Sequence, residues 1–393
     1  MIPVLILAFT AMIGLYIVAV YPILLRCWRR AAPPVKKDRE FRPTVSVLLA
    51  VYNGEDFIQK KLESLFVLKY AANLLDVVVV SDGSTDATDE IVARFADRRV
   101  RLVKVPHGGK AAALNAGMIH ASGEVVFFTD VRQTLDPDAL SNLVANFADP
   151  SVGAVTGAPR FLHANRVGEQ ADMDLYWRYE LWTRKRHSQI DSVLATTGWI
   201  YAVRRTLAEP VPPDTLTDDL IIPLRVLLRG YRVIFDPAAL AFDYAEIQGG
   251  EFRRKLRTLA GLWQVCVRVP GLFTRANRMR FHFVSNKVAR LVLPWAILCF
   301  SAATLALPAG PFRLVLLLAE LTVLALALLD GFLPRHFLLR RISSPARSFL
   351  IVNAASLLSV MVFFVRPETL WRPTRVKVGT SQRLLNKQAE RGS

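Results

Sequence analysis

Cysteine and histidine are scarce in this chain of 393 residues, which holds three cysteines and six histidines. The cysteines, Cys27, Cys266 and Cys299, lie in or beside apolar stretches without regular spacing. Such a pattern argues against a disulfide framework and against a cysteine-based metal cluster. The histidines are scattered without ligand spacing, which also argues against a zinc site. Any chemistry in this chain is therefore expected from other side chains.

Acidic residues are also in deficit, because 33 of them stand against 50 lysines and arginines, for a net charge of +17. Nucleic acid is one partner that such an excess attracts. However, the basic residues gather beside apolar runs, in 26–37, 253–257, 275–290 and 335–347. Anionic lipid headgroups attract basic residues in that position. We therefore expect a membrane surface, and no nucleic acid, as the partner of this charge.

Charge is absent from residues 2–25, a stretch that is long enough to cross a bilayer, which takes about twenty apolar residues. The nearest basic residues, in 26–37, follow this stretch, whereas a signal peptide has them in front. We therefore expect residues 1–25 to be an N-terminal transmembrane anchor. Because basic flanking residues stay on the cytoplasmic side, the chain that follows is expected in the cytoplasm.

Three more apolar stretches lie near the end of the chain, at 291–307, 312–333 and 349–365. They predict a C-terminal transmembrane region of about three helices over 284–365. Three crossings after a cytoplasmic domain place the basic tail, 366–393, outside the cell, against the usual distribution of basic residues. A re-entrant or interfacial segment in this region removes that conflict, so the side of the tail is left open.

Between the membrane segments, short apolar runs alternate with helical patterns. The predicted strands are 45–51, 77–81, 100–105 and 125–129, and the predicted helices are 56–66, 87–95 and 110–120. This alternation is typical of a doubly wound, mostly parallel α/β sheet that helices cover on both faces. We expect a basic linker at 26–42, the α/β domain at 43–250, and a basic amphipathic segment on the membrane surface at 251–283.

Two of the predicted strands lead into aspartates, because Asp82 follows Val77–Ser81 and Asp130 follows Val125–Thr129. Ligands of open α/β sheets bind at the carboxyl ends of the strands. Carboxylates at that edge can hold a ribose or a metal-bound diphosphate. A third acidic cluster, Thr217-Asp218-Asp219, follows later and offers a general base. This order predicts a nucleotide-sugar transferase.

Taken together, these motifs resemble the membrane-bound, inverting enzymes of glycosyltransferase family 2 over 43–264. Relatives of those enzymes include cellulose, chitin, hyaluronan and poly-N-acetylglucosamine synthases and ceramide glucosyltransferases. The resemblance implies a GT-A fold, a nucleotide-diphosphate sugar as donor, with a UDP-sugar favoured, and a polysaccharide or lipid acceptor. It further implies a multi-pass protein of the bacterial inner membrane, with a cytoplasmic catalytic domain that builds polysaccharide of the cell envelope.

The resemblance assigns a set of residues to the donor. The loop of Tyr52, Asn53 and Glu55 would surround the base and the ribose, Asp82 would accept hydrogen bonds from them, and the segment of Lys110 and Asn115 would approach the diphosphate. The complete predicted donor set is Tyr52, Asn53, Glu55, Asp82, Lys110, Asn115, Asp130 and Arg132. From the residues alone, the first loop also fits an ordinary turn.

Asp130 resembles the first aspartate of the family's metal-binding Asp-x-Asp, which implies Mg²⁺ or Mn²⁺ beside the departing diphosphate. Arg132 stands where the second aspartate is expected, so metal coordination by this motif depends on Asp130 alone. Two roles are open for Arg132. It either supplies positive charge to the diphosphate directly or lies on the acceptor side.

Thr217-Asp218-Asp219 resembles the family's Thr-Glu-Asp, which implies that Asp219 is the general base, with Asp218 beside it as a catalytic residue. In an inverting transfer, one carboxylate deprotonates the acceptor hydroxyl while its oxygen attacks the anomeric carbon. The same residues also fit the N-cap of a helix that carries Leu220 to Leu228. The two roles are compatible, because capping by one residue leaves the next one available.

The acceptor is assigned to two segments. Thr197, Gly198 and Trp199 resemble the acceptor-binding loop, although Trp199 fits a core position equally well. Arg254 and Arg257 lie where processive members carry Gln-x-x-Arg-Trp, with Arg254 in place of the glutamine and a threonine in place of the tryptophan. Three activities therefore stay open: polysaccharide synthesis, transfer of one sugar to a lipid, and a non-catalytic scaffold in a polysaccharide-export complex.

Overall fold

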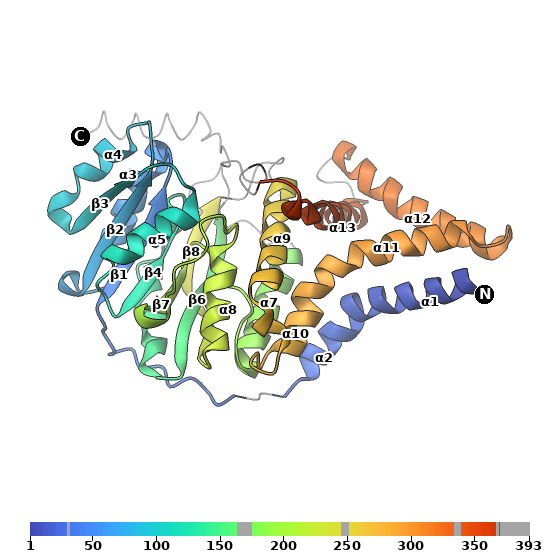
Figure 1. Cartoon of the computed structure of the whole chain (residues 1–393), viewed down its shortest axis with the longest axis horizontal. Coiled ribbons are helices and arrows are strands. Elements are labelled where there is room, and N and C mark those ends of the chain that lie inside the picture. Colours follow the sequence, from blue (N-terminus) through green and yellow to red (C-terminus); the bar gives the residue numbers. More distant parts are fainter. Residues whose placement is uncertain (30–31, 163–174, 245–250, 334–338, 367–368, 370–393) are drawn as a thin grey trace. The chain divides into compact units, whose positions relative to one another are not determined.

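The computed structural model describes the whole chain apart from residues 30–31, 163–174, 245–250, 334–338, 367–368 and 370–393. The chain divides into two compact units (Figure 1). One unit consists of Met1–Arg29 and Glu251–Leu370 and contains helices alone among its described residues. The other consists of Arg30–Gly250 and Trp371–Ser393 and contains the sheet.

The sheet has eight strands in the order β3-β2-β1-β4-β7-β6-β8-β5. Their bounds are β1 Val45–Val51, β2 Leu75–Asp82, β3 Val100–Val105, β4 Val125–Phe128, β5 Thr134–Leu135, β6 Val152–Leu162, β7 Tyr201–Arg204 and β8 Arg232–Tyr244. Strands β3, β2, β1 and β4 pair in parallel, as do β6 and β8, whereas β7 is antiparallel to both of its neighbours. The prediction of a doubly wound, mostly parallel sheet is confirmed.

The helices of this unit follow the strands closely in the first half of the chain. They are α3 Glu55–Phe66, α4 Thr88–Ala93, α5 Lys110–His120, α6 Ala139–Val144, α7 Leu175–Ile190 and α8 Asp218–Leu228. Helix α5 has the predicted bounds, whereas α4 begins one residue later than predicted, because Asp86 accepts a hydrogen bond from the backbone N–H of Thr88. A side chain that accepts the first N–H groups of a helix marks its start.

The central strands are buried on both faces, which explains why they consist of continuous valine-rich runs rather than alternating ones. On one face, Val47 and Leu49 join the main apolar cluster with Ile58 and Leu62 of α3. On the other face, α5 lies against β1 and β2 (Figure 1). It packs so closely that a Cβ at Gly117 would lie 2.3 Å from the side chain of Leu48.

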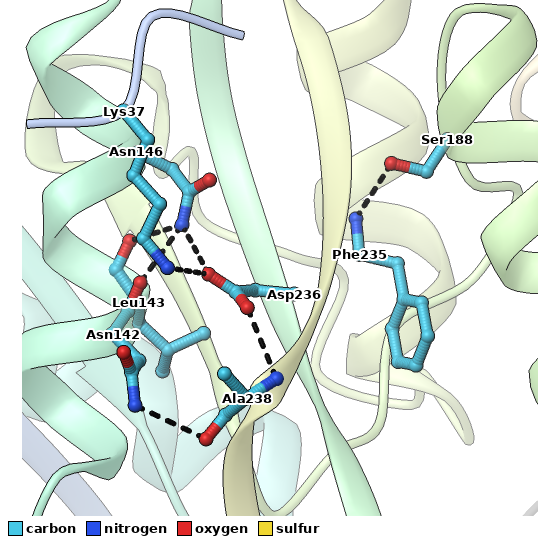
Figure 2. Close-up of polar contacts among 8 residues, drawn as sticks. All are labelled: Lys37, Asn142, Leu143, Asn146, Ser188, Phe235, Asp236 and Ala238. Carbon is cyan, nitrogen blue, oxygen red and sulfur yellow. Dashed lines mark hydrogen bonds and ion pairs between the residues drawn. The ribbon is translucent and has the colours of Figure 1, made fainter.

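The segment that precedes the sheet is attached to it through a buried carboxylate on β8, as Figure 2 shows. Lys37 Nζ and Asn146 Nδ2 donate to Asp236 Oδ2 at 2.6 and 2.7 Å, and the N–H of Ala238 donates to Asp236 Oδ1 at 3.1 Å. The Asp236 side chain is 7% exposed. A carboxylate with three donors at this depth holds together the linker, the 3-10 helix Ala145–Ala148 that follows α6, and β8.

The helical unit contains four helices that are long and apolar enough to cross a membrane: Ile2–Cys27, Arg280–Leu305, Pro311–Phe332 and Arg340–Phe363. All four predicted apolar stretches therefore lie in such helices. Within them the structure has α1 Ile2–Leu15, α2 Tyr21–Cys27, α10 Arg280–Phe283, α11 Ala289–Leu305, α12 Pro311–Leu329 and α13 Arg340–Ser359. The helix α9, Glu251–Arg268, precedes α10 in this unit. Most of the basic tail at 366–393 lies outside the described residues.

Two of these helices start well before the predicted apolar stretch, at Arg280 and Arg340 rather than near residues 291 and 349. Polar residues at the end of a span lie at headgroup depth, where they do not interrupt the helix. Inside the unit, Glu320 accepts a hydrogen bond from Thr304 Oγ1 at 2.9 Å, and the buried Asp330 accepts one from Ser343 Oγ at 2.7 Å. Carboxylates in such segments are thus satisfied by neighbouring helices.

The Asp236 contacts predict the effect of two substitutions on stability. Asp236→Ala removes the shared acceptor of Lys37, Asn146 and the Ala238 N–H, so we expect a loss of about 2 kcal/mol in the free energy of unfolding, measured by chemical denaturation of the full chain in detergent. Lys37→Met is the matched control. We expect a loss below about 1 kcal/mol there, because Asn146 and Ala238 still donate. Equal unfolding midpoints for Asp236→Ala and the unchanged protein would contradict this role.

Candidate active site

The carboxyl ends of β1 and β2 form the first part of the site. Asp82 ends β2, and its buried carboxylate accepts the backbone N–H groups of Gly108 at 2.8 Å and Gly109 at 3.0 Å. His107 Nδ1 lies 3.0 Å from Asp82 Oδ2, and the ring centroids of His107 and Tyr52 are 4.3 Å apart. Asp82 therefore holds the loop that leads into α5, and this loop places an imidazole against Tyr52.

A glycine at position 83 permits this close approach. Gly83 has a φ of +69°, and a Cβ there would lie 2.8 Å from the backbone nitrogen of His107. A residue with a side chain would be both strained and crowded at this point. The turn after β2 therefore depends on Gly83 to bring residues 107–109 against the strand end.

The loops after β1 and β2 are bonded to each other. Asn53 Oδ1 accepts the N–H of Thr85 at 2.8 Å, and the N–H of Asn53 donates to Ser84 Oγ at 3.1 Å. Glu55 makes the same kind of exchange, because its N–H donates to Asp86 Oδ2 and its Oε2 accepts the N–H of Ala87, both at 3.0 Å. Asn53 and Glu55 thus fix the shape of the predicted base-binding loop. Their direct contact with a donor stays a prediction.

Lys110 joins two of the three acidic motifs. It is the first residue of α5, and its Nζ lies 2.9 Å from Asp130 Oδ1 and 3.1 Å from Asp218 Oδ1. Burial opposes the charge of Lys110, but the carboxylates of Asp130, Asp218 and Asp219 outweigh it and raise the pKa of Lys110 above its ordinary value. Asp130 and the adjacent pair Asp218 and Asp219, which are far from it in the sequence, therefore gather around one ammonium group.

Asp218 is further held by Tyr201, whose hydroxyl donates to Asp218 Oδ2 at 3.1 Å. Burial, together with the nearby charges of Asp218 and Asp219, raises the pKa of Tyr201, so its hydroxyl keeps its proton and remains a donor. With Lys110 on one oxygen and Tyr201 on the other, the buried carboxylate of Asp218 is fixed in place. This arrangement suits a supporting residue better than a base that moves a proton.

Asp219 lies in the first turn of α8, where the partial positive charge of the helix N-terminus favours a carboxylate. The backbone N–H and the hydroxyl of Thr196 both donate to the carbonyl oxygen of Asp219, at 3.1 and 2.7 Å. A Cβ at Gly198 would lie 3.2 Å from Asp219 Oδ2. The predicted acceptor loop and the predicted base are therefore neighbours. Thr217 is at the N-cap position but makes no side-chain capping bond.

Comparison with known proteins identifies the domain at this point. Residues 46–209 match the model of the family described as glycosyl transferase family 2. This part of the chain is a glycosyl transferase family 2 domain. It contains the ends of β1 and β2, Lys110 and Asp130, while Asp218 and Asp219 follow its matched range.

Proteins similar to part of this chain include polysaccharide synthases. The poly-β-1,6-N-acetyl-D-glucosamine synthase of Staphylococcus aureus strain MSSA476 is 27% identical over 244 residues, which are 60% of this chain and 58% of that protein. The synthase of the same name from Staphylococcus epidermidis is 24% identical over 274 residues, 68% of this chain and 66% of that protein. The chain thus spans under two thirds of the length of these synthases.

Among solved structures, the mannosyltransferase PcManGT from Pyrobaculum calidifontis, in complex with GDP-Man and Mn²⁺, resembles this chain with a TM-score of 0.72. The two are 25% identical, and the match covers 93% of this chain and 99% of that one. The GT-A fold expected from the sequence is thereby confirmed.

In the acceptor loop, the buried Thr197 hydroxyl accepts a hydrogen bond from Arg184 Nη1, and Arg184 Nε lies 3.5 Å from Glu180 Oε1 on the same helix, α7. Thr197 is therefore fixed from α7. Trp199 is half-buried and packs against the main apolar cluster, and the ring centroids of Trp199 and Phe161 are 6.2 Å apart. These contacts correspond to the core alternative for Trp199, and stacking of this ring on a sugar stays a prediction.

Arg132 is directed to a carboxylate that the motifs do not include. Its Nη2 pairs with Asp243 on β8, and Gln133 Nε2 donates to the same oxygen at 2.9 Å. The buried Asp243 thus compensates the charge of Arg132. The Asn115 side chain also bonds to the protein itself. Its Nδ2 donates to the carbonyl oxygen of Val211 at 2.7 Å, and its Oδ1 accepts the N–H of Val211 at 2.9 Å. It ties α5 to the segment before α8.

Arg254 and Arg257 lie on α9, which belongs to the helical unit, so their predicted contact with acceptor or diphosphate stays a prediction. The motifs did not include five residues that contact the predicted site residues or hold their partners: Tyr201, Asp243, Arg184, Glu180 and His107. His107 has a signal in the sequence, since it directly precedes Gly108-Gly109-Lys110. Asp243 has none, because 111 positions separate it from Arg132.

The described residues contain no group of three or more His, Cys, Asp or Glu side chains placed to hold a metal ion. Asp130 offers one carboxylate that is 36% exposed and lies at the strand edge. Mg²⁺ and similar ions are commonly bound by one or two carboxylates together with phosphate oxygens of the substrate and water. The residues therefore fit an ion that arrives with a diphosphate better than a permanent protein-only site.

The position of Lys110 predicts a pH-dependent effect on stability. Because its pKa is raised in the folded chain, Lys110 stabilises the fold at all pH values below its ordinary pKa of 10.5, and this contribution is lost as the pH rises through the folded value. Lys110→Met should lower the melting temperature at pH 7 through repulsion among the three aspartates. The difference should stay constant from about pH 6 to about pH 9, because this range lies below the ordinary pKa of Lys110. A difference that disappears within this range would argue against the charge effect.

Proposed function

We propose that this chain is a membrane-bound inverting glycosyltransferase, which transfers a sugar from a nucleotide-diphosphate sugar to a growing polysaccharide or lipid-linked glycan. The observation that carries the proposal is the gathering of Asp130, Asp218 and Asp219 around Lys110 at the carboxyl edge of the sheet. The family 2 domain supports it, as does the likeness to synthases of an N-acetylglucosamine polymer and to a mannosyltransferase that holds GDP-Man.

Asp219 is the general base in this proposal. It takes the proton of the acceptor hydroxyl while that oxygen forms a bond to the anomeric carbon and the nucleoside diphosphate leaves from the opposite face. Its place beside Gly198 and the Thr196 backbone supports the role, because the acceptor loop then delivers the hydroxyl to the carboxylate. Asp218, held by Tyr201 and Lys110, keeps the start of α8 in position.

The donor lies along the ends of β1, β2 and β4. Tyr52, His107 and Asp82 surround the base and ribose, and Lys110 faces the diphosphate. When Mg²⁺ or Mn²⁺ is bound, it neutralises charge on the leaving diphosphate, and Asp130 would hold it. The Mn²⁺ in the mannosyltransferase structure supports this assignment. A UDP-sugar agrees with the sequence resemblance, whereas that neighbour holds a GDP-sugar, so both nucleotides belong in the assay.

The four apolar helices support a multi-pass protein of the bacterial inner membrane. We assign residues 1–25 to the anchor, 26–42 to the linker, 43–250 to a cytoplasmic catalytic domain, 251–283 to an interfacial segment and 284–365 to the transmembrane region. The basic residues of 26–37 support the cytoplasmic side for the catalytic domain. Nucleotide sugars are made in that compartment, and the product belongs to the cell envelope.

Transfer of a single sugar to a lipid is the second candidate, and one position favours it. Thr258 stands where processive relatives have a tryptophan, and its hydroxyl donates to the carbonyl of Arg254 at 2.9 Å. A threonine offers no ring for stacking on the acceptor sugar. The length of the product separates the two candidates: a polymer supports chain synthesis, and a product with one added sugar supports the lipid enzyme.

The role of Asp219 is tested by nucleotide release from UDP-, GDP- and dTDP-sugars with the full chain in detergent and membrane acceptors. We expect Asp219→Asn to lose at least about 1,000-fold in kcat while it retains donor affinity, because it lacks the base but keeps the shape. Asp97→Asn, at an exposed position on a short helix, is the matched control and should keep full activity. Full turnover in Asp219→Asn would exclude this base.

Metal dependence is tested by chelation. We expect EDTA to abolish nucleotide release and Mn²⁺ or Mg²⁺ to restore it, because without the ion Lys110 compensates only part of the negative charge on the leaving diphosphate. Asp130→Asn should raise the Mn²⁺ concentration needed for half-maximal activity by about 10-fold or more. Undiminished release in EDTA would assign the charge compensation to Lys110 instead.

A further inference from the structure

A lysine that the motifs do not include lies buried beneath the Asp130 loop. Lys61 is on α3, is 1% exposed, and is among the largest fully buried side chains of the chain. Burial lowers its pKa to about 7, although the charge of Asp130 acts in the opposite direction. An amine at this depth costs stability unless its donors are satisfied, so its contacts show what the fold gains from it.

The donors of Lys61 go to both ends of one short loop. Its Nζ donates to Thr129 Oγ1 at 2.6 Å and to the carbonyl oxygen of Gln133 at 2.7 Å. The residues between these two acceptors are 130–132, which include Asp130 at the strand edge. One amine therefore closes the loop from below, as a clamp across its base.

The same contact extends to the acceptor loop. Thr129 Oγ1 accepts the hydrogen bond from Lys61 and donates its own proton to the carbonyl oxygen of Trp199 at 2.8 Å. Trp199 follows Gly198, the residue that lies against Asp219. A continuous path of hydrogen bonds thus runs from Lys61 through Thr129 to the loop beside the proposed base.

The far end of the Asp130 loop is held separately. Arg132 and Gln133 both bond to Asp243 on β8. Without Lys61, the loop would keep this attachment to β8 but lose the amine that joins Thr129 Oγ1 at one end to the Gln133 carbonyl at the other. Lys61 thus adds the contact that fixes the two ends of the loop to each other and to α3.

We propose that Lys61 is a positioning residue for sugar transfer, which holds the carboxylate of Asp130 and the Trp199 backbone in one fixed arrangement. The proposal rests on the proposed function. Because it is buried, Lys61 acts through Thr129 and Gln133 and does not touch substrate. Displacement of reacting groups by about 1 Å can cost 100-fold in rate, so a clamp of this kind matters to turnover.

The first test compares Lys61→Met with Lys60→Met, the same change at the exposed neighbour on the same helix. Methionine fills the space but donates no hydrogen bond. We expect Lys61→Met to lower kcat/KM about 10- to 100-fold and to raise the Mn²⁺ concentration for half-maximal activity, while Lys60→Met keeps both values. Unchanged values in a folded Lys61→Met would overturn the proposal.

A second variant serves if Lys61→Met does not fold. Thr129→Val preserves the shape of the side chain and removes both hydrogen bonds of its hydroxyl, while Lys61 keeps the Gln133 carbonyl. We expect a loss in kcat/KM in the same direction. In the background of Asp130→Asn, Lys61→Met should add less than about 3-fold, because it leaves the bond from Thr129 to Trp199 in place and acts through Asp130. Losses that multiply in that double variant would overturn the proposal.

Hydrogen–deuterium exchange supplies a readout that needs no activity. Peptides that cover 129–135 should exchange faster in Lys61→Met than in Lys60→Met, whereas peptides from β1 should be unchanged. Equal exchange in the 129–135 peptides would overturn the clamp. If the unchanged protein releases no nucleotide from any donor, the proposed function fails. The exchange measurement still decides whether Lys61 holds the loop.

Discussion

The crowding of negative charge at one edge of the sheet is the constraint on which the rest of the structure depends. A parallel sheet places the ends of its strands together, and here those ends carry Asp82 and Asp130, with Asp218 and Asp219 at the start of α8. Carboxylates this close repel each other unless cations or N–H groups face them. Lys110 and the backbone of Gly108 and Gly109 meet that need.

Much of the unit that contains the sheet could be predicted from sequence, because its strands are short and apolar and are separated by turns with recognisable turn residues. The positions of Asp82, Lys110 and Asp130 follow from the rule that parallel strands end at a common edge. The partners of Arg132 could not be predicted. Asp243 reaches it because β5, which begins two residues after Arg132, pairs with β8, and local patterns do not encode that pairing. The burial of Lys61 could not be predicted either, because a lysine on a helix is ordinarily exposed to solvent.

The helical unit shows a related limit. Hydropathy located the four long apolar helices among the described residues, because length and composition suffice for that purpose. It did not locate their ends, since two of these helices begin at arginines, Arg280 and Arg340, well before the apolar stretch. Nor could it pair Glu320 with Thr304 or Asp330 with Ser343. Such pairs make a carboxylate tolerable among apolar helices, and they depend on which helices become neighbours.

The bonds between the loops after β1 and β2 have a consequence for how such a site can diverge. Asn53 and Glu55 each give and receive a hydrogen bond across the two loops, so neither loop can change length without breaking its partner's contacts. Loops usually accept insertions readily. In the proposed donor site, a change in the preferred nucleotide would therefore have to come from side chains on a backbone of constant shape, at positions such as Tyr52 and His107.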